Sequence, residues 1–187
     1  MNENEQYIAD SIKTWVWYGF HDQDEIQEMI DDILEGDVDE DMLRSLVKKE
    51  IAIKQQEEHS WPKITDCDKI DAVFEALNRG GVVALQGAGY TMSDGLEDVS
   101  QVLAELDHNS IISGYCFYHS QDIERAMAGE GLMLAFGDLA NTPEGKTKVG
   151  KLICSTLKAN GLNYDWNENP EIRINITSIR WQRRYCA

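Results

Sequence analysis

The segment GYCFYHSQDIERAMAGEGLMLAFGD, residues 114–138, decides the fold. It begins with a short apolar and aromatic run, Gly114–Tyr118, and ends with a second apolar run, Leu132–Phe136. Between them, apolar residues recur at helical spacing from Ile123 to Met127. The segment therefore predicts a strand, a short helix and a second strand, an order typical of an α/β or α+β domain.

The same alternation of strand and helix extends to both sides of this segment. On the amino-terminal side, Val82–Leu85 is a short buried-strand candidate, followed by the loop QGAGYTMSDG and a helix. On the carboxyl-terminal side, Asn141-Thr142-Pro143 opens a helix, and extended runs follow at Leu162–Trp166 and Ile172–Ile176. We therefore expect a mixed, largely parallel sheet of about five strands flanked by helices.

The first 60 residues have a purely helical pattern. Three apolar stripes occur there at i, i+3, i+4 spacing: Ile8, Ile12 and Trp15; Ile26, Met29, Ile30 and Ile33; Leu43, Leu46, Val47 and Ile51. Trp61-Pro62 then breaks the pattern, because proline disfavours helix in the residue before it. We predict an N-terminal three-helix layer over residues 1–60 and an α/β core domain over residues 61–187.

Charge is the strongest signal in the composition. The net charge is −17, of which residues 1–60 carry −12 and residues 61–187 carry −5. Such a surface repels phosphate backbones and anionic lipids, so we expect neither nucleic-acid nor membrane binding. The charge also fits a basic protein partner, although a charged run is commonly only a solvated face. It leaves the oligomeric state open.

Several classes of protein are excluded by missing patterns. The acidic start MNENEQ does not predict a signal peptide, and no run reaches the ~18 apolar residues of a membrane span. We therefore expect a soluble, cytoplasmic protein. The four scattered cysteines form no zinc pattern and no small disulfide framework, and no H-E-x-x-H or G-x-S-x-G motif occurs. Neither a metal nor a cofactor is predicted.

A candidate site follows if the strands at 114–118 and 132–136 are parallel neighbours. Parallel strands place their carboxyl ends at one edge of the sheet, which is where α/β proteins bind ligands. His119 would then be a general acid or base oriented by Asp138 or Asp122. The predicted lining consists of catalytic candidates His119, Asp138 and Asp122, and ligand-binding candidates Gln86, Gly87, Gly89, Tyr90 and Tyr118.

A structural explanation competes with this site. Ser120 can cap the helix that follows it, and Asp122 and Glu124 suit the positive end of its dipole. The glycine loop lacks the third glycine of a dinucleotide fingerprint, which would stand at Met92, and it lacks the Gly-Lys-Ser/Thr of a P-loop. Arg180, Arg183 and Arg184 near Trp181 are predicted to pair or stack against the acidic helices.

Four motifs carry a resemblance to a known family. They are W-P-x-x-T-D-C-D at Trp61–Asp68, G-Y-x-F-Y-H-x-Q-D-x-E at Gly114–Glu124, G-L-M-L-A-F-G at Gly131–Gly137, and I-x-W-Q-R-R at Ile179–Arg184. In these motifs the chain resembles a family of uncharacterised bacterial proteins defined only as a domain of unknown function. The resemblance covers roughly residues 61–187 and implies no activity.

Two hypotheses about function follow. The first is a non-catalytic cytosolic binding or regulatory protein that engages a protein partner through its acidic helices or its sheet edge. The second is a small-molecule enzyme with His119 as general acid or base and the loop 86–91 contacting substrate. The absence of a catalytic motif favours the first hypothesis.

Overall fold

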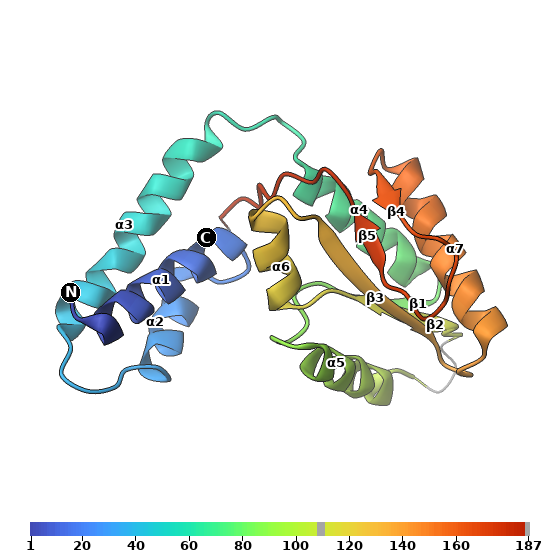
Figure 1. Ribbon diagram of the computed structural model, residues 1–187, viewed down its shortest axis with the longest axis horizontal. Coiled ribbons are helices and arrows are strands. Elements are labelled where there is room, and N and C mark those ends of the chain that lie inside the picture. Colours follow the sequence, from blue (N-terminus) through green and yellow to red (C-terminus); the bar gives the residue numbers. More distant parts are fainter. Residues whose placement is uncertain (108–110, 186–187) are drawn as a thin grey trace. The chain divides into compact units, whose positions relative to one another are not determined.

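The computed structural model describes residues 1–107 and 111–185 of the chain. Figure 1 shows their helices and strands. In chain order these are α1 (Glu3–Tyr18), α2 (Gln23–Asp31), α3 (Glu40–Glu58), α4 (Asp66–Arg79), β1 (Val82–Leu85), α5 (Met92–Glu105), β2 (Gly114–Phe117), α6 (Ser120–Met127), β3 (Leu132–Asp138), α7 (Pro143–Ala159), β4 (Tyr164–Asp165) and β5 (Ile174–Ile176).

The chain divides into two compact units. The helical unit comprises Met1–Lys63 together with the C-terminal residues from Gln182, and the sheet unit comprises Ile64–Trp181. The predicted division placed the whole C-terminus with the sheet. In the structure the C-terminal residues belong to the helical unit instead. Arg183 lies over the Phe20 ring of that unit, 4.3 Å from its centroid. The backbone N–H of Tyr185 also donates to Glu58 Oε1 there, at 2.7 Å.

The helical unit has its own apolar core. The three predicted stripes supply all of its buried apolar cluster except Val16; the cluster consists of Ile8, Ile12, Val16, Ile26, Ile30, Leu43, Val47 and Ile51. The helix α2 begins with a capping box, because Asp22 accepts from the N–H of Glu25 and the Glu25 carboxylate accepts from the N–H of Asp22. Three helices thus form here, whereas the predicted layer of helices against the sheet stays a prediction.

The units share the acidic charge almost equally. The helical unit carries 17 acidic and 8 basic side chains, and the sheet unit carries 17 acidic and 9 basic ones. Lys63, Arg183 and Arg184 belong to the helical unit and offset part of the acidity of residues 1–60. The excess of negative charge is therefore a property of both units.

The sheet unit is a mixed α+β domain with one open sheet. Its strand order is β1-β2-β3-β5-β4, in which only β1 and β2 are parallel. The other three neighbouring pairs are antiparallel, so the predicted largely parallel sheet is wrong. The helix α6 has only eight residues and is followed by a tight turn, in which the N–H of Glu130 donates to Arg125 O. This turn reverses the chain and sends β3 back alongside β2.

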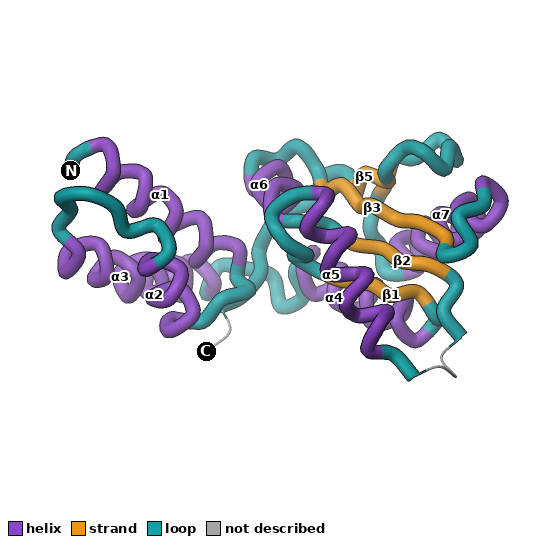
Figure 2. Tube along the Cα trace, turned by 90° about the horizontal axis from the view of Figure 1, so that it is seen from below, coloured by secondary structure: helices purple, strands orange, loops and turns teal. Residues whose placement is uncertain are grey.

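The two faces of the sheet are covered to different extents. The helices α4 and α7 contact each other and pack on one face, whereas α5 and α6 lie on the other. Figure 2 shows α6 near one end of β3 and α5 in front of β1, with much of β2 and β3 visible beyond the two helices. Successive side chains of a strand point to opposite faces. Thus Phe136 packs beside Gly150 of α7, whereas Ala135 packs in a cluster with Val99 of α5.

Candidate functional site

The parallel pair β1 and β2 brings most of the predicted site residues to one edge of the sheet. Leu85 pairs with Phe117, so the loop 86–91 and His119 leave the sheet at the same end. The N–H and the hydroxyl of Ser120 both donate to the carbonyl of Gly89, each at 3.0 Å. The residues gathered at this edge are Gln86, Gly87, Gly89, Tyr90, Tyr118, His119 and Asp122.

Two of these residues belong to an internal hydrogen-bond chain. The buried Tyr118 hydroxyl donates to Gln86 Oε1 at 2.7 Å, and Gln86 Nε2 donates to Asp71 Oδ1 at 2.9 Å. The Tyr118 ring also makes edge-to-face contacts with Phe74 and Trp181. Tyr118 and Gln86 therefore connect the loop 86–91 to α4 and to the aromatic residues of the core.

The glycine loop is closed from the inside by a carboxylate. Asp94 Oδ2 accepts from the N–H groups of Tyr90 and Thr91 at 3.2 and 2.8 Å, and these hydrogen bonds hold the pKa of Asp94 below its usual range. Gly89 has φ +58°, and an added Cβ there would lie 2.3 Å from Asp94 Cβ, so glycine is required. The amide groups that could bind a phosphate therefore already have an anion, the Asp94 carboxylate. Tyr90 is half exposed beside them.

His119 is enclosed within the fold. Its residue is 5% exposed, and its Nε2 lies 3.2 Å from both Asp122 Oδ2 and Arg173 Nη1. Burial lowers the pKa of His119, and the Arg173 charge acts in the same direction, against Asp122 and Asp94. The backbone N–H of His119 donates to Asp122 Oδ2 at 3.2 Å. Nδ1 is buried, and it has no partner among residues 1–107 and 111–185.

Asp122 is the buried anion of this group, and Arg173 is its cation. Arg173 Nη2 donates to Asp122 Oδ1 at 2.7 Å and Nη1 donates to Oδ2 at 3.1 Å, a bidentate pair. The Asp122 side chain is 1% exposed, whereas the Arg173 side chain is 27% exposed. The arginine therefore links a fully buried carboxylate to the surface of the sheet unit.

Asp138 does not join this group, and its predicted role beside His119 is wrong. Because β3 is antiparallel to β2, Asp138 pairs with Gly114 at the opposite end of β2 from His119. Its carboxylate accepts from the N–H and the hydroxyl of Thr142 at 3.1 and 3.0 Å. These hydrogen bonds lower the pKa of Asp138 and secure the turn that leads into α7.

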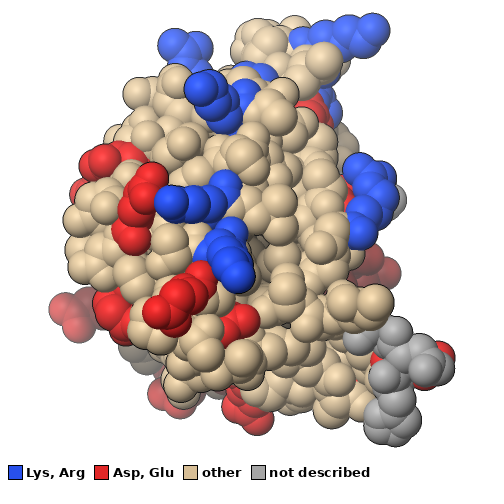
Figure 3. Space-filling view, turned by 90° about the vertical axis from the view of Figure 1, so that its right-hand side faces the viewer, with Lys and Arg blue, Asp and Glu red and all other residues tan. Residues whose placement is uncertain are grey.

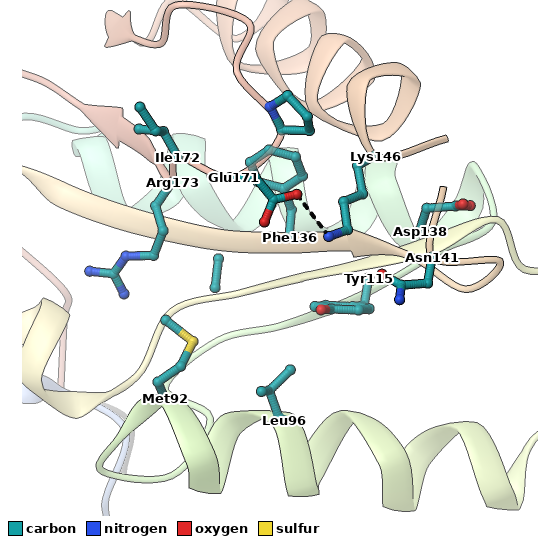
Figure 4. A pocket seen from close by; sticks show the side chains of 12 residues that line it. Met92, Leu96, Tyr115, Phe136, Asp138, Asn141, Lys146, Glu171, Ile172 and Arg173 are labelled. Carbon is teal, nitrogen blue, oxygen red and sulfur yellow. Dashed lines mark hydrogen bonds and ion pairs between the residues drawn. The ribbon is translucent and has the colours of Figure 1, made fainter. Parts of the chain in front are cut away.

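A groove lies over the part of the sheet that α5 and α6 leave uncovered. We call it the sheet groove; it has a volume of about 200 Å³, and Figure 4 shows it with α5 on one side and the segment 170–173 on the other. It is lined by Met92, Leu96, Tyr115, Ala135, Phe136, Asp138, Asn141, Lys146, Pro170, Glu171, Ile172 and Arg173. His119 is not among its lining residues.

A single glycine makes room for the aromatic residue in this groove. An added Cβ at Gly137 would lie 2.5 Å from the Tyr115 ring, so the ring rests directly on the backbone of β3. Partial burial raises the pKa of Tyr115, and the charge of Lys146 opposes that shift only in part. Tyr115 is therefore a neutral, fixed aromatic surface in the groove.

The charged residues of the groove are mostly paired. Lys146 Nζ donates to Glu171 Oε1 at 3.0 Å, which is the dashed contact in Figure 4. Lys151, also on α7, pairs with Glu168 at 2.9 Å. Figure 3, which views the α7 side of the sheet unit, shows Lys and Arg side chains gathered beside Asp and Glu side chains. This face is therefore mixed in charge despite the acidic composition of the unit.

The described residues have few other features that carry chemistry. Among them, no group of three or more His, Cys, Asp or Glu side chains is arranged to hold a metal ion, and no helix is long and apolar enough to cross a membrane. Cys67, Cys116 and Cys154 are buried free thiols. Burial raises the pKa of Cys116 well above its usual range and that of Cys154 to about 11.

Sequence reasoning missed Arg173 and the sheet groove. The alternation Ile172-Arg173-Ile174 indicates only that Arg173 points away from the side occupied by its isoleucine neighbours. Its partner Asp122 is 51 positions away, a separation that no local pattern encodes. In the structure Leu96 and Ile172 are 40% and 46% exposed, and exposed apolar residues near one another mark binding surfaces, but no pattern in the sequence indicates this exposure.

The chain belongs to a family described as a domain of unknown function, DUF6891, whose model matches residues 1–185. The match extends over both units, whereas the motifs that carried the resemblance lie within residues 61–187 and only a looser helical similarity preceded them. The comparisons with curated proteins and with solved structures each gave no match.

Proposed function

We propose that this member of the family is a non-catalytic binding protein that takes a segment of a protein partner into the sheet groove. The observation that carries the proposal is the groove itself, which lies over an uncovered stretch of β2 and β3. On its rims Leu96 is 40% exposed and Ile172 is 46% exposed. Apolar side chains that are exposed together on one groove do not stabilise the fold, and they are typical of a binding surface.

The size of the groove supports a protein partner. Sites for small molecules and cofactors typically have volumes of ~300–1,000 Å³ and enclose most of the ligand. A groove of about 200 Å³ that is open along one side is smaller and suits one or two side chains of a longer segment. Peptides bind such grooves through a few apolar anchors, with polar groups fixing their position.

The groove combines the two kinds of group that such binding requires. Leu96, Ile172 and the Tyr115 ring supply apolar surface, and the ring is held rigid by its contact with Gly137. Rigid aromatic residues contribute strongly to binding because they lose little conformational entropy. Arg173 and the Lys146–Glu171 pair supply polar groups along the same surface.

The surroundings of His119 favour binding over catalysis. A general base must come within hydrogen-bond reach of a substrate proton. Nε2 of His119 is occupied by Asp122 and Arg173, and Nδ1 is enclosed by protein. The imidazole therefore orients other side chains within the fold.

The acidic charge of the chain gives a second property of the partner. With a net charge of −17, the protein attracts a basic partner over a distance of about one Debye length, ~8 Å at physiological salt. Attraction of this kind raises the association rate more than it raises affinity. The partner is therefore expected to carry net positive charge.

Site-specific photocrosslinking in cells tests the proposal. A photoreactive phenylalanine at Leu96 is expected to give one discrete protein adduct, whereas the same residue at Lys158, which is exposed on α7, is expected to give none. An additional Ile172→Glu substitution on the opposite rim should abolish the Leu96 adduct. Equal adducts from both positions, or adducts that survive the Ile172 change, would refute the groove as the binding site.

A further inference from the structure

We infer that Arg173 binds the C-terminal carboxylate of the partner's chain. This inference rests on the proposed function and adds the chemistry that the sheet groove recognises. It follows from the hydrogen bonds that the guanidinium makes, from the groups that fix its position, and from the apolar residues beside it.

The guanidinium of Arg173 is only partly used within the fold. Its outer edge, Nη1 and Nη2, binds Asp122, and Nη1 also contacts His119 Nε2. The N–H of Nε and the second N–H of Nη2 have no partner among the residues that the structure describes. These two donors lie on the second edge of the planar guanidinium and are parallel, so they match the two oxygens of one carboxylate.

Buried residues hold this second edge in position. Asp122 is fully buried at the start of α6, and a bidentate pair with it fixes both the plane and the direction of the guanidinium. His119, itself 5% exposed, contacts Nη1 from the side. Since a long arginine side chain loses rotamer freedom when it binds a ligand, an arginine that is already fixed loses less on binding. The His119–Asp122 pair is thus a positioning device for Arg173.

The neighbours of Arg173 select a chain end over a side-chain carboxylate. Figure 4 shows the guanidinium above Met92, with Leu96 farther along the same helix and Ile172 on the opposite side. A C-terminal residue carries its carboxylate and its side chain on the same carbon atom. Such a residue can place its carboxylate on Arg173 and its apolar side chain between Met92 and Leu96. A glutamate side chain separates the charge from the nearest apolar group.

Because the charges of the site largely cancel, we expect binding to need the carboxylate contact with Arg173 and the apolar contact together. Asp122 offsets the charge of Arg173, Glu171 offsets that of Lys146, and Asp138 adds a further carboxylate to the lining, so a free anion gains little from the groove as a whole. We therefore expect weak binding of an inorganic anion and stronger binding of a carboxylate that brings an apolar side chain. An aliphatic C-terminal residue meets this requirement.

The test follows the Nε–Hε signal of Arg173 by NMR in the ¹⁵N-labelled full chain. N-acetylleucine is expected to shift this signal in a saturable way, whereas N-acetylleucinamide, which lacks the carboxylate, and inorganic phosphate should leave it unchanged. The Nε–Hε signal of Arg79, whose side chain is 73% exposed on α4, is the internal control for general anion binding. In Arg173→Lys, which keeps the charge but loses the planar edge and its Nε–Hε signal, the backbone amide shifts of Ile172 and Ile174 should show N-acetylleucine binding about tenfold more weakly than in the unchanged chain.

The outcomes separate this inference from the proposed function. An unshifted Arg173 signal, an equal shift with the amide, or a larger shift with phosphate would overturn the carboxylate assignment. A photocrosslinked partner that binds through Leu96 but tolerates Arg173→Lys, or removal of its own C-terminal residue, would overturn it while leaving the groove in place. The inference falls together with the proposed function if Leu96 gives no discrete adduct, if Leu96 and Lys158 give equal adducts, or if the Leu96 adduct survives Ile172→Glu.

Discussion

The two units of this protein each bury a charged group, and they use it differently. In the helical unit, Lys54 of α3 is fully buried, and its Nζ donates to the carbonyl of Val16 in the last turn of α1 at 2.8 Å. The last turn of α1 has no basic residue of its own, so Lys54 supplies the positive charge there. In the sheet unit, the buried charge is Asp122, and it holds an arginine that is 27% exposed on a groove.

The comparison separates a structural charge from a candidate binding group. The Lys54 ammonium lies wholly inside its unit and meets the backbone, so its role is complete within the fold. Arg173 meets its buried partner with one edge and lines a groove with the rest of the side chain. Partial exposure with a fixed orientation is what recognition of a ligand requires.

The largest effect is expected from Arg173→Met in the sheet unit. This change leaves the Asp122 carboxylate buried without its cation, and breaking a buried pair in this way costs about 3–5 kcal/mol of unfolding free energy. Urea denaturation measures the loss, and hydrogen exchange should place it in α6 and β3. A variant with an unchanged urea midpoint would contradict the buried pair.

Lys54→Met is the matched change in the helical unit. Methionine fills a similar length, but the carbonyl of Val16 loses this donor, so we expect a loss of about 1–3 kcal/mol. Hydrogen exchange should increase at the C-terminal end of α1 and leave β3 as it was. Faster exchange in β3 would show that the two buried charges do not act separately.

Gly137→Ala sharpens the account of the groove. The new methyl group would lie about 2.5 Å from the Tyr115 ring, which must then move off β3. We expect a loss of about 1–3 kcal/mol from this overpacking, together with a change in the Tyr115 ring signals in NMR spectra. Gly129→Ala is the control for glycine loss alone: no atom lies within 4 Å of its added Cβ, although its φ of +80° adds local strain. It should leave the Tyr115 signals unchanged.

The pH dependence of stability is expected to be the smallest effect. Because burial lowers the pKa of His119 below its ordinary 6.5, the unfolded chain binds a proton at a higher pH than the native chain does. The contribution of His119 is thus fully present above pH ~6.5 and is lost progressively as the pH falls toward its lower native pKa. His119→Gln should flatten the urea midpoint between pH ~7.5 and ~5.5. An equally steep profile in the variant would contradict a buried neutral imidazole.

These expectations also show how far the sequence predicts the structure. Periodicity predicts the three helices of residues 1–60, because each apolar stripe is a local pattern. The sheet edge shared by the loop 86–91 and His119 was predictable for the same reason. A loop and a helix connect β1 to β2, and this order is typical of parallel strands. Strand direction after α6 was not, because the sequence pattern of residues 128–131 does not indicate in which direction the chain leaves the turn.

The sheet groove could not be derived from local patterns. It combines side chains from α5, β2, β3, the start of α7 and the segment 170–173, and its position depends on β3 being antiparallel to β2. Arg173 stands directly before β5, the last of the described strands, and its side chain reaches Asp122 of α6, which is 51 positions earlier. Packing of distant segments, more than propensity, thus decides where a ligand could bind.

The most direct test of the account is the affinity of the photocrosslinked partner for two matched variants. Leu96→Glu places a charge on the groove rim, whereas Lys158→Glu places one on α7, on the other face of the sheet. Isothermal titration calorimetry should show about tenfold or greater loss of affinity for the Leu96 variant and near wild-type affinity for the Lys158 variant. Equal losses in both variants, or a loss confined to Lys158→Glu, would contradict binding in the sheet groove.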